Sequence, residues 1–141
     1  MIISIASDHA GFDLKTHLIS ELKISGISII DSGCYDTFSC DYPDYAKKTC
    51  KDVIDKKASF GVLICGTGIG MSICANKFSG IRAALCTNEL MAEKARQHND
   101  ANILVLGARI TKKNEAVNIL IKFLESIFEG GRHQMRLNKF A

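Results

Sequence analysis

The segment "VLICGTGIGMSICANK", from Val62 to Lys77, joins a thiol to a glycine-rich loop, and this pair of features can do chemistry. An apolar run ends in Cys65, and three alternating glycines follow at once: Gly66, Gly68 and Gly70. Glycines let backbone N–H groups approach a ligand closely, and a loop that leads into a helix favours negative charge. The same field stabilises a thiolate, so Cys65 is a candidate base. A thiolate beside such a loop suits proton removal next to a carbonyl group, because the loop can hold the anionic intermediate.

The spacing of the loop excludes three common phosphate-binding motifs. A dinucleotide fingerprint requires a third glycine where Met71 stands, and a cysteine phosphatase would place an arginine at that same position. A nucleotide P-loop requires Gly-Lys-Ser/Thr, which follows neither Gly61 nor Gly66. A structural alternative remains, in which Cys65 is only the last buried residue of a strand, and spacing alone does not decide between the two interpretations.

Short apolar runs alternate with helical patterns, and these elements must position the loop. Five strands are predicted, over residues 2–6, 27–31, 60–65, 81–86 and 102–107. Helical patterns lie between and after them, over residues 11–26, 41–57, the segment after the loop to about 77, 89–98 and 114–131. Strands that alternate with helices predict right-handed crossovers. We therefore expect a three-layer α/β/α Rossmann-like sandwich with a five-stranded parallel sheet.

Length and composition predict a single domain over residues 1–141. Of the 141 residues, 47% are hydrophobic and 23% charged, as in ordinary globular proteins. A net charge of +3 without a dense basic run argues against nucleic acid, and no apolar run is long enough for a membrane span. The start "MIISIASDHAGF" lacks the basic region of a signal peptide, and the six cysteines form no C-x-x-C pair. We expect a cytoplasmic protein with reduced thiols.

Further polar candidates follow other strands, where ligands bind in sheets of this kind. Asp8 and His9 come after the first strand, and Arg109 comes after the fifth. For Asp8 alone a helix cap is the stronger explanation, whereas His9 has no such routine role and favours contact of the pair with a polar ligand.

The last third of the chain carries two more candidate groups. His98 lies near a helix C-terminus, where the helix dipole is a sufficient structural reason for it. Arg132 and Arg136 lie four residues apart and would suit a phosphate if the tail is helical, although a solvated basic tail is the simpler alternative. The last long helix carries two neighbouring apolar stripes, one of Val117, Leu120, Ile121, Leu124 and Phe128, the other of Ile119, Phe123 and Ile127. This exceeds what one sheet face can cover, so we expect a partner subunit rather than a fully buried helix.

The motifs "SDHAGF", "DYPDYA", "ICGTGIGMSICANK", "IRAALC", "RQHNDANILVLGAR" and "EGGRHQMR" stand in this order along the chain. Together they closely resemble the B-type ribose-5-phosphate isomerases, which belong to a wider sugar-phosphate isomerase family with galactose-6-phosphate isomerase subunits. The resemblance implies an aldose–ketose isomerase of the pentose phosphate pathway that needs no cofactor and no metal. It also implies a homodimer or dimer of dimers whose active sites are shared between subunits.

The resemblance also implies the catalytic roles. Cys65 would move a proton between C1 and C2 of the open sugar, through an enediolate. His98 would open the furanose ring, with Thr67 as an assistant. The enediolate oxygens would be held by the backbone of the glycine loop: Gly66, Thr67, Gly68, Ile69 and Gly70.

The binding roles follow in the same way. The sugar would be contacted by Asp8, His9, Tyr42 and Asn99. Arg132 and Arg136 would bind the phosphate, with Arg109 and His9 nearby and some of these groups coming from the partner. A C-terminal helical tail over about 129–141 would thus complete the phosphate site.

Met71 identifies the branch of the family that the chain resembles. One branch uses a glutamate base just after the third glycine, and a methionine there cannot accept a proton. The resemblance is therefore to the branch with a thiol base. Two alternatives stay open: an isomerase of a six-carbon sugar phosphate, such as allose 6-phosphate or galactose 6-phosphate, and a non-catalytic sugar-phosphate-binding module. The presence of both Cys65 and His98 argues against the second, because a binder needs neither.

Overall fold

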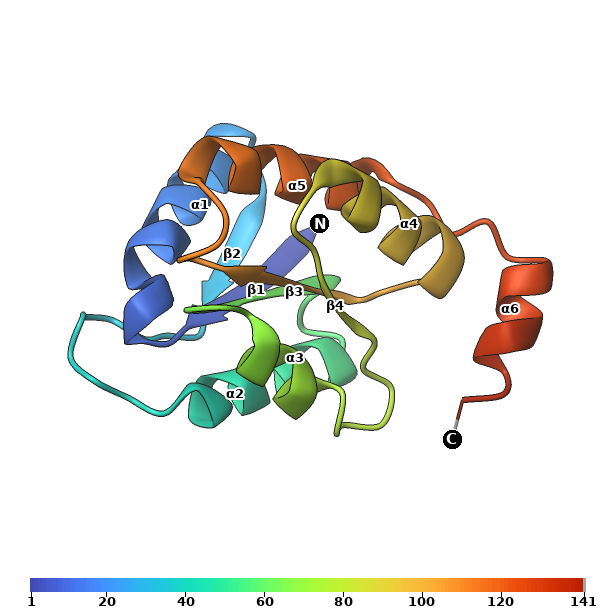
Figure 1. The fold of residues 1–141 in the computed structure, drawn as a ribbon, viewed down its shortest axis with the longest axis horizontal. Coiled ribbons are helices and arrows are strands. Elements are labelled where there is room, and N and C mark those ends of the chain that lie inside the picture. The colour runs from blue at the N-terminus through green and yellow to red at the C-terminus, as the bar shows by residue number, and fades with distance from the viewer. Residues whose placement is uncertain (141) are drawn as a thin grey trace.

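The computed structural model describes residues 1–140 and has three layers (Figure 1). A parallel sheet of five strands runs through the middle in the order β2-β1-β3-β5-β4. The strands are β1 (Ile2–Ser7), β2 (Ser28–Asp31), β3 (Phe60–Cys65), β4 (Ala83–Leu85) and β5 (Ile103–Gly107). The fold class predicted from the sequence, a three-layer α/β/α sandwich, is confirmed.

Helices cover both faces of the sheet (Figure 1). One face carries α1 (Phe12–Ile24), α4 (Glu89–Asn99) and α5 (Lys113–Glu125), and the other carries α2 (Tyr42–Ile54) and α3 (Ile69–Ala75). A short 3-10 helix, His9–Gly11, precedes α1, and α6 (Arg132–Leu137) ends the described fold. Among residues 1–140, none of the helices combines the length and the apolar character that a membrane crossing requires.

The central strands are apolar because both of their faces are buried. In β3, Leu63 and its neighbours have no exposed surface, and β5 is buried from end to end. Local signals fix the helix ends. Pro43 stands in the first turn of α2, the Asn88 side chain accepts a hydrogen bond from the N–H of Met91 at the start of α4, and Gly26, with φ +75°, follows the end of α1.

Several predicted boundaries differ from the structure by one or more residues. The edge strand β4 is shorter than residues 81–86, and β2 begins at Ser28. The helical pattern over 114–131 also overruns, because the chain turns to an extended conformation at Ser126, with φ −80° and ψ 142°. The predicted tail over about 129–141 is helical only in α6, and Ala141 lies outside the described residues. A sequence pattern cannot locate such an end, since residues 127 and 128 still fit the apolar stripes.

The topology creates a switch point at the carboxyl edge of the sheet. From β1 the chain turns to α1 on one face, and from β3 it turns to α3 on the opposite face. β1 and β3 are neighbours, so the two connections diverge between them. Such a switch point is where open α/β sheets bind ligands.

Candidate active site

Cys65 ends β3 at this switch point, and it is 5% exposed. The backbone N–H of Gly68 turns back and donates a hydrogen bond to its Sγ at 3.2 Å. The side chain of Thr67 is exposed at the tip of the loop, where its Oγ1 accepts from the N–H of Ile69 at 3.3 Å. An N–H directed at sulfur is the contact that a thiolate accepts. The loop therefore places a thiol and backbone donors side by side, as the sequence predicted.

Two glycines of the loop let other candidate side chains pack against it. A Cβ on Gly70 would lie 2.6 Å from Cζ of Tyr42, and a Cβ on Gly66 would lie 2.9 Å from a guanidinium nitrogen of Arg109. The Arg109 N–H also donates to the carbonyl of Gly66 at 2.9 Å. The structure thus brings Tyr42 and Arg109, predicted from distant parts of the sequence, onto the loop of Cys65.

The conformation of the loop depends on a left-handed backbone at Gly68. Its φ of +82° costs a side chain about 1–2 kcal/mol, and a Cβ there would lie 2.5 Å from Cδ1 of Leu85. Gly68→Ala is therefore expected to move the loop and to lower turnover at this site by about 10²-fold. Gly26→Ala is the matched control, because Gly26 has φ +75° but nothing within 4 Å. Equal activities of the two variants in a turnover assay would show that loop geometry is unimportant.

Asp8 and His9 follow β1 at the same switch point. Oδ1 of Asp8 accepts hydrogen bonds from the N–H groups of Ala10 (3.0 Å) and Gly11 (3.1 Å), so the capping role is confirmed. The Asp8 N–H donates to the carbonyl of Ile64, next to Cys65. Nδ1 of His9 accepts from the N–H of Cys40 at 3.2 Å, which leaves Nε2 for a ligand.

A second group of candidates lies at the opposite edge of the sheet. His98 and Asn99 end α4, and Arg132 and Arg136 lie on α6, exposed to solvent. Figure 1 shows α6 at the far end of the molecule from the β3–α3 loop. The pairing of β3 with β5 explains this separation. Cys65, at the end of β3, pairs with Gly107 at the end of β5, whereas α4 ends shortly before Ile103, where β5 begins. Four residues of strand, about 13 Å, separate the two edges.

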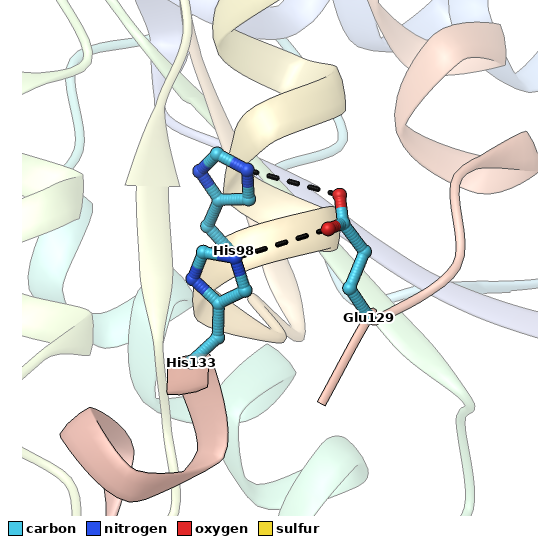
Figure 2. A group of neighbouring side chains, drawn as sticks. All are labelled: His98, Glu129 and His133. Atoms are coloured by element: carbon cyan, nitrogen blue, oxygen red, sulfur yellow. Dashed lines mark ion pairs between the residues drawn. The ribbon is translucent and has the colours of Figure 1, made fainter. Parts of the chain in front are cut away.

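Two residues that the sequence analysis missed complete this second group (Figure 2). The rings of His98 and His133 stack with centroids 4.1 Å apart and planes 9° from parallel. Nε2 of His98 lies 3.8 Å from Oε1 of Glu129, and Nε2 of His133 lies 3.8 Å from Oε2. Glu129 and His133 both belong to the motif "EGGRHQMR", in which only the arginines were predicted to bind a ligand. The spacing of four residues between Glu129 and His133 was the available signal.

The environment of His133 favours its neutral form. Burial lowers the pKa of His133 first, the nearby His98, Arg132 and Arg136 lower it further, and Glu129 opposes them. Donor atoms of His98, Glu129 and His133 all lie within 4.8 Å of one another, so their types would suit a metal ion. The stacked rings keep their nitrogen lone pairs in two nearly parallel planes, however, so the lone pairs do not converge on one ion about 2 Å from each nitrogen.

Apolar side chains remain exposed on several elements. Ile119, Leu120 and Phe123 of α5 are buried in the core, whereas Ile121 and Ile127 are 46% and 79% exposed. Exposed apolar residues elsewhere include Ile69, Ile73, Leu90, Met91 and Met135. The partner subunit predicted from the apolar stripes therefore stays a prediction, and the described chain has the apolar surface that it requires.

The fold defines an α/β protein with a thiol and a glycine-rich loop at the switch point of its parallel sheet. The sequence model of the ribose/galactose isomerase family matches residues 3–140, and the chain belongs to that family. Ribose-5-phosphate isomerase B of Escherichia coli is 42% identical to it over 96% of this chain and 91% of its own length.

Solved structures of proteins similar to this chain have the same fold. A structure of ribose-5-phosphate isomerase B from Clostridium thermocellum superposes with a TM-score of 0.98 at 47% identity, covering 99% of this chain and 94% of that one. Another, from Mycoplasma genitalium with bound ribulose 5-phosphate, has a TM-score of 0.93 at 42% identity and covers 98% of this chain and 92% of that one. The family and the Rossmann-like fold that the motifs indicated are thus confirmed.

Proposed function

We propose that the chain is a ribose-5-phosphate isomerase, which interconverts D-ribose 5-phosphate and D-ribulose 5-phosphate. The relatives described above carry this name, and one of them holds the ketose product. The observation that carries the proposal is the buried Cys65 thiol, with the Gly68 N–H donating to its Sγ at 3.2 Å, at the mouth of a loop of backbone donors. Aldose–ketose isomerisation requires a base beside a site that stabilises an enediolate, and this loop supplies both.

The proton transfer follows from this geometry. The Cys65 thiolate removes the proton from C2 of the open aldose, and the electron pair of that bond forms the C1–C2 double bond of the enediolate. The N–H groups of the loop stabilise the negative oxygen. The thiol then returns the proton to C1 while the proton of the O2 hydroxyl passes to the negative O1, which leaves the C2 carbonyl and the C1 hydroxyl of the ketose. Met71, which follows the loop, is fully buried, and its thioether accepts no proton, so it offers no competing base.

We also propose that two copies of the chain form each active site. His98, Asn99, Arg132 and Arg136 lie at one edge of the sheet and Cys65 at the other, so one chain offers two separate halves. In a homodimer the second half would come from the other copy, and the exposed apolar residues would be covered. The six cysteines are unpaired, as suits the reducing cytoplasm, where we place the enzyme.

A substrate comparison tests the proposed function. Metal-stripped protein is assayed with ribose 5-phosphate, allose 6-phosphate and galactose 6-phosphate in parallel. Preference for ribose 5-phosphate supports the proposal. Preference for a six-carbon substrate would contradict the substrate while keeping the chemistry, and no turnover of any of the three would contradict the function itself.

Arg136 tests the phosphate site. Its side chain is exposed on α6, one helical turn from Arg132, so both guanidinium groups can face one phosphate. Arg136→Ala is expected to raise KM for ribose 5-phosphate by about tenfold or more, with a smaller change in kcat, because it removes a contact present throughout the reaction. Steady-state kinetics check this. Lys139→Ala, which removes a charge from the same tail, is the control, and an unchanged KM for Arg136→Ala would contradict the assignment.

A further inference from the structure

The group of His98, Glu129 and His133 goes beyond the residues that the proposed function uses. His98 is 36% exposed at its side chain, whereas His133 is 7% exposed, so His133 forms the inner wall and His98 the outer surface. Figure 2 shows the Glu129 carboxylate beside both rings, with the other ring nitrogen of each histidine on the side away from it. Nε2 of His133 is buried and has no hydrogen-bond partner among residues 1–140. The Glu129 carboxylate lies 3.8 Å from this buried nitrogen and is therefore placed to accept a hydrogen bond from it.

We propose that Glu129 is a positioning residue for His98: its carboxylate, together with the stacked ring of His133, fixes the imidazole so that Nδ1 is presented to the sugar. This inference rests on the proposed function, in which His98 opens the furanose ring.

The carboxylate determines which nitrogen of His98 carries the proton. A carboxylate facing one imidazole nitrogen favours the proton on that nitrogen, which is Nε2 here, and leaves the lone pair of Nδ1 free. The present separation of 3.8 Å is about 1 Å longer than a charge-assisted hydrogen bond, so a small movement of the exposed Glu129 side chain closes it.

Ring opening then uses both sides of the imidazole. Nδ1 accepts the proton of the C1 hydroxyl as the C1=O double bond forms and the C1–O4 bond breaks. The imidazolium gives the same proton to O4, so no proton is gained or lost. Negative charge on Glu129 stabilises the imidazolium that exists between the two transfers. His133 can stay stacked against it because its lowered pKa keeps that ring neutral.

The backbone of Glu129 has a structural role that does not involve its side chain. The function of the side chain can therefore be tested by substitution. Its N–H donates to the carbonyl of Gln97 at 3.0 Å and ties the extended segment before α6 to α4. A side-chain substitution leaves this hydrogen bond in place. Glu129→Gln therefore removes the charge while it preserves size and tether. Glu125→Gln is the matched control, because Glu125 is an exposed carboxylate at the end of α5.

A double-mutant cycle with ribose 5-phosphate tests the proposal. Glu129→Gln is expected to lower kcat by about ten- to a hundredfold in wild-type protein, and Glu125→Gln to leave it unchanged. In a His98→Asn background, Glu129→Gln is expected to have no further effect, since it acts through His98. Residual turnover stays measurable there because the furanose also opens spontaneously in water.

The outcomes separate this inference from the proposed function. An equal loss from Glu129→Gln with and without His98 would overturn the positioning role and indicate a structural one. Activity of Glu129→Gln at the wild-type level would overturn it too. Wild-type protein that turns over no ribose 5-phosphate would instead contradict the proposed function.

Discussion

Cys65→Ala is expected to lower turnover of ribose 5-phosphate by about 10³-fold or more, because it removes the proposed base. The thiol is 5% exposed at the end of β3, and removal of its Sγ leaves a small space rather than a rearranged loop. Binding of ribulose 5-phosphate is expected to stay within about twofold of wild type, since the loop N–H groups and the arginines remain. Calorimetric titration of the ketose, run beside the turnover assay, separates these two effects.

A second cysteine variant makes the result specific. Cys74 lies in α3, only two turns after the loop, and is half-buried. Cys74→Ala should keep wild-type turnover, because it removes a thiol that faces the core between α2 and α3. Substantial activity in Cys65→Ala would contradict the thiol base and return Cys65 to a purely structural role.

The sequence was most informative where chemistry and local structure coincide. The apolar runs of β3 and β5 identify buried strands because both faces are covered, and the glycines after Cys65 identify the loop because only small residues fit against Tyr42 and Arg109. The capping interpretation of Asp8 is confirmed for the same reason, and the cap of α4 by Asn88 is equally local, since each is a contact within a few residues.

Contacts between distant segments were harder to predict. Glu129 meets His98 only because the chain leaves α5 at Ser126 and runs extended back to α4, a turn that no local pattern marks. The stacking of His133 on His98 depends on this turn as well. Residue types that do chemistry could therefore be named from the sequence, whereas the residues that orient them required the fold.

The separation of Cys65 from His98 has the largest consequence for assembly. Each lies at the end of a rigid element, Cys65 on a central strand and His98 on α4, which packs against α5. A bending motion within one chain cannot bring them together, because the length of the sheet lies between them. The proposal that both groups act on one substrate therefore predicts that each site takes His98 from a second copy of the chain.

Mixing two impaired variants tests this prediction. Cys65→Ala and His98→Asn, unfolded together and refolded in equal amounts, are expected to regain about a quarter of wild-type turnover, because half of the dimers are mixed and one of their two sites is intact. Each variant refolded alone gives the baseline. The double variant, with both substitutions in one chain, is the control, since mixing it with Cys65→Ala leaves no site with an intact thiol. Mixed dimers seen by mass spectrometry without recovered activity would place the complete site in one chain, and a stable monomer in gel filtration would contradict the shared site altogether.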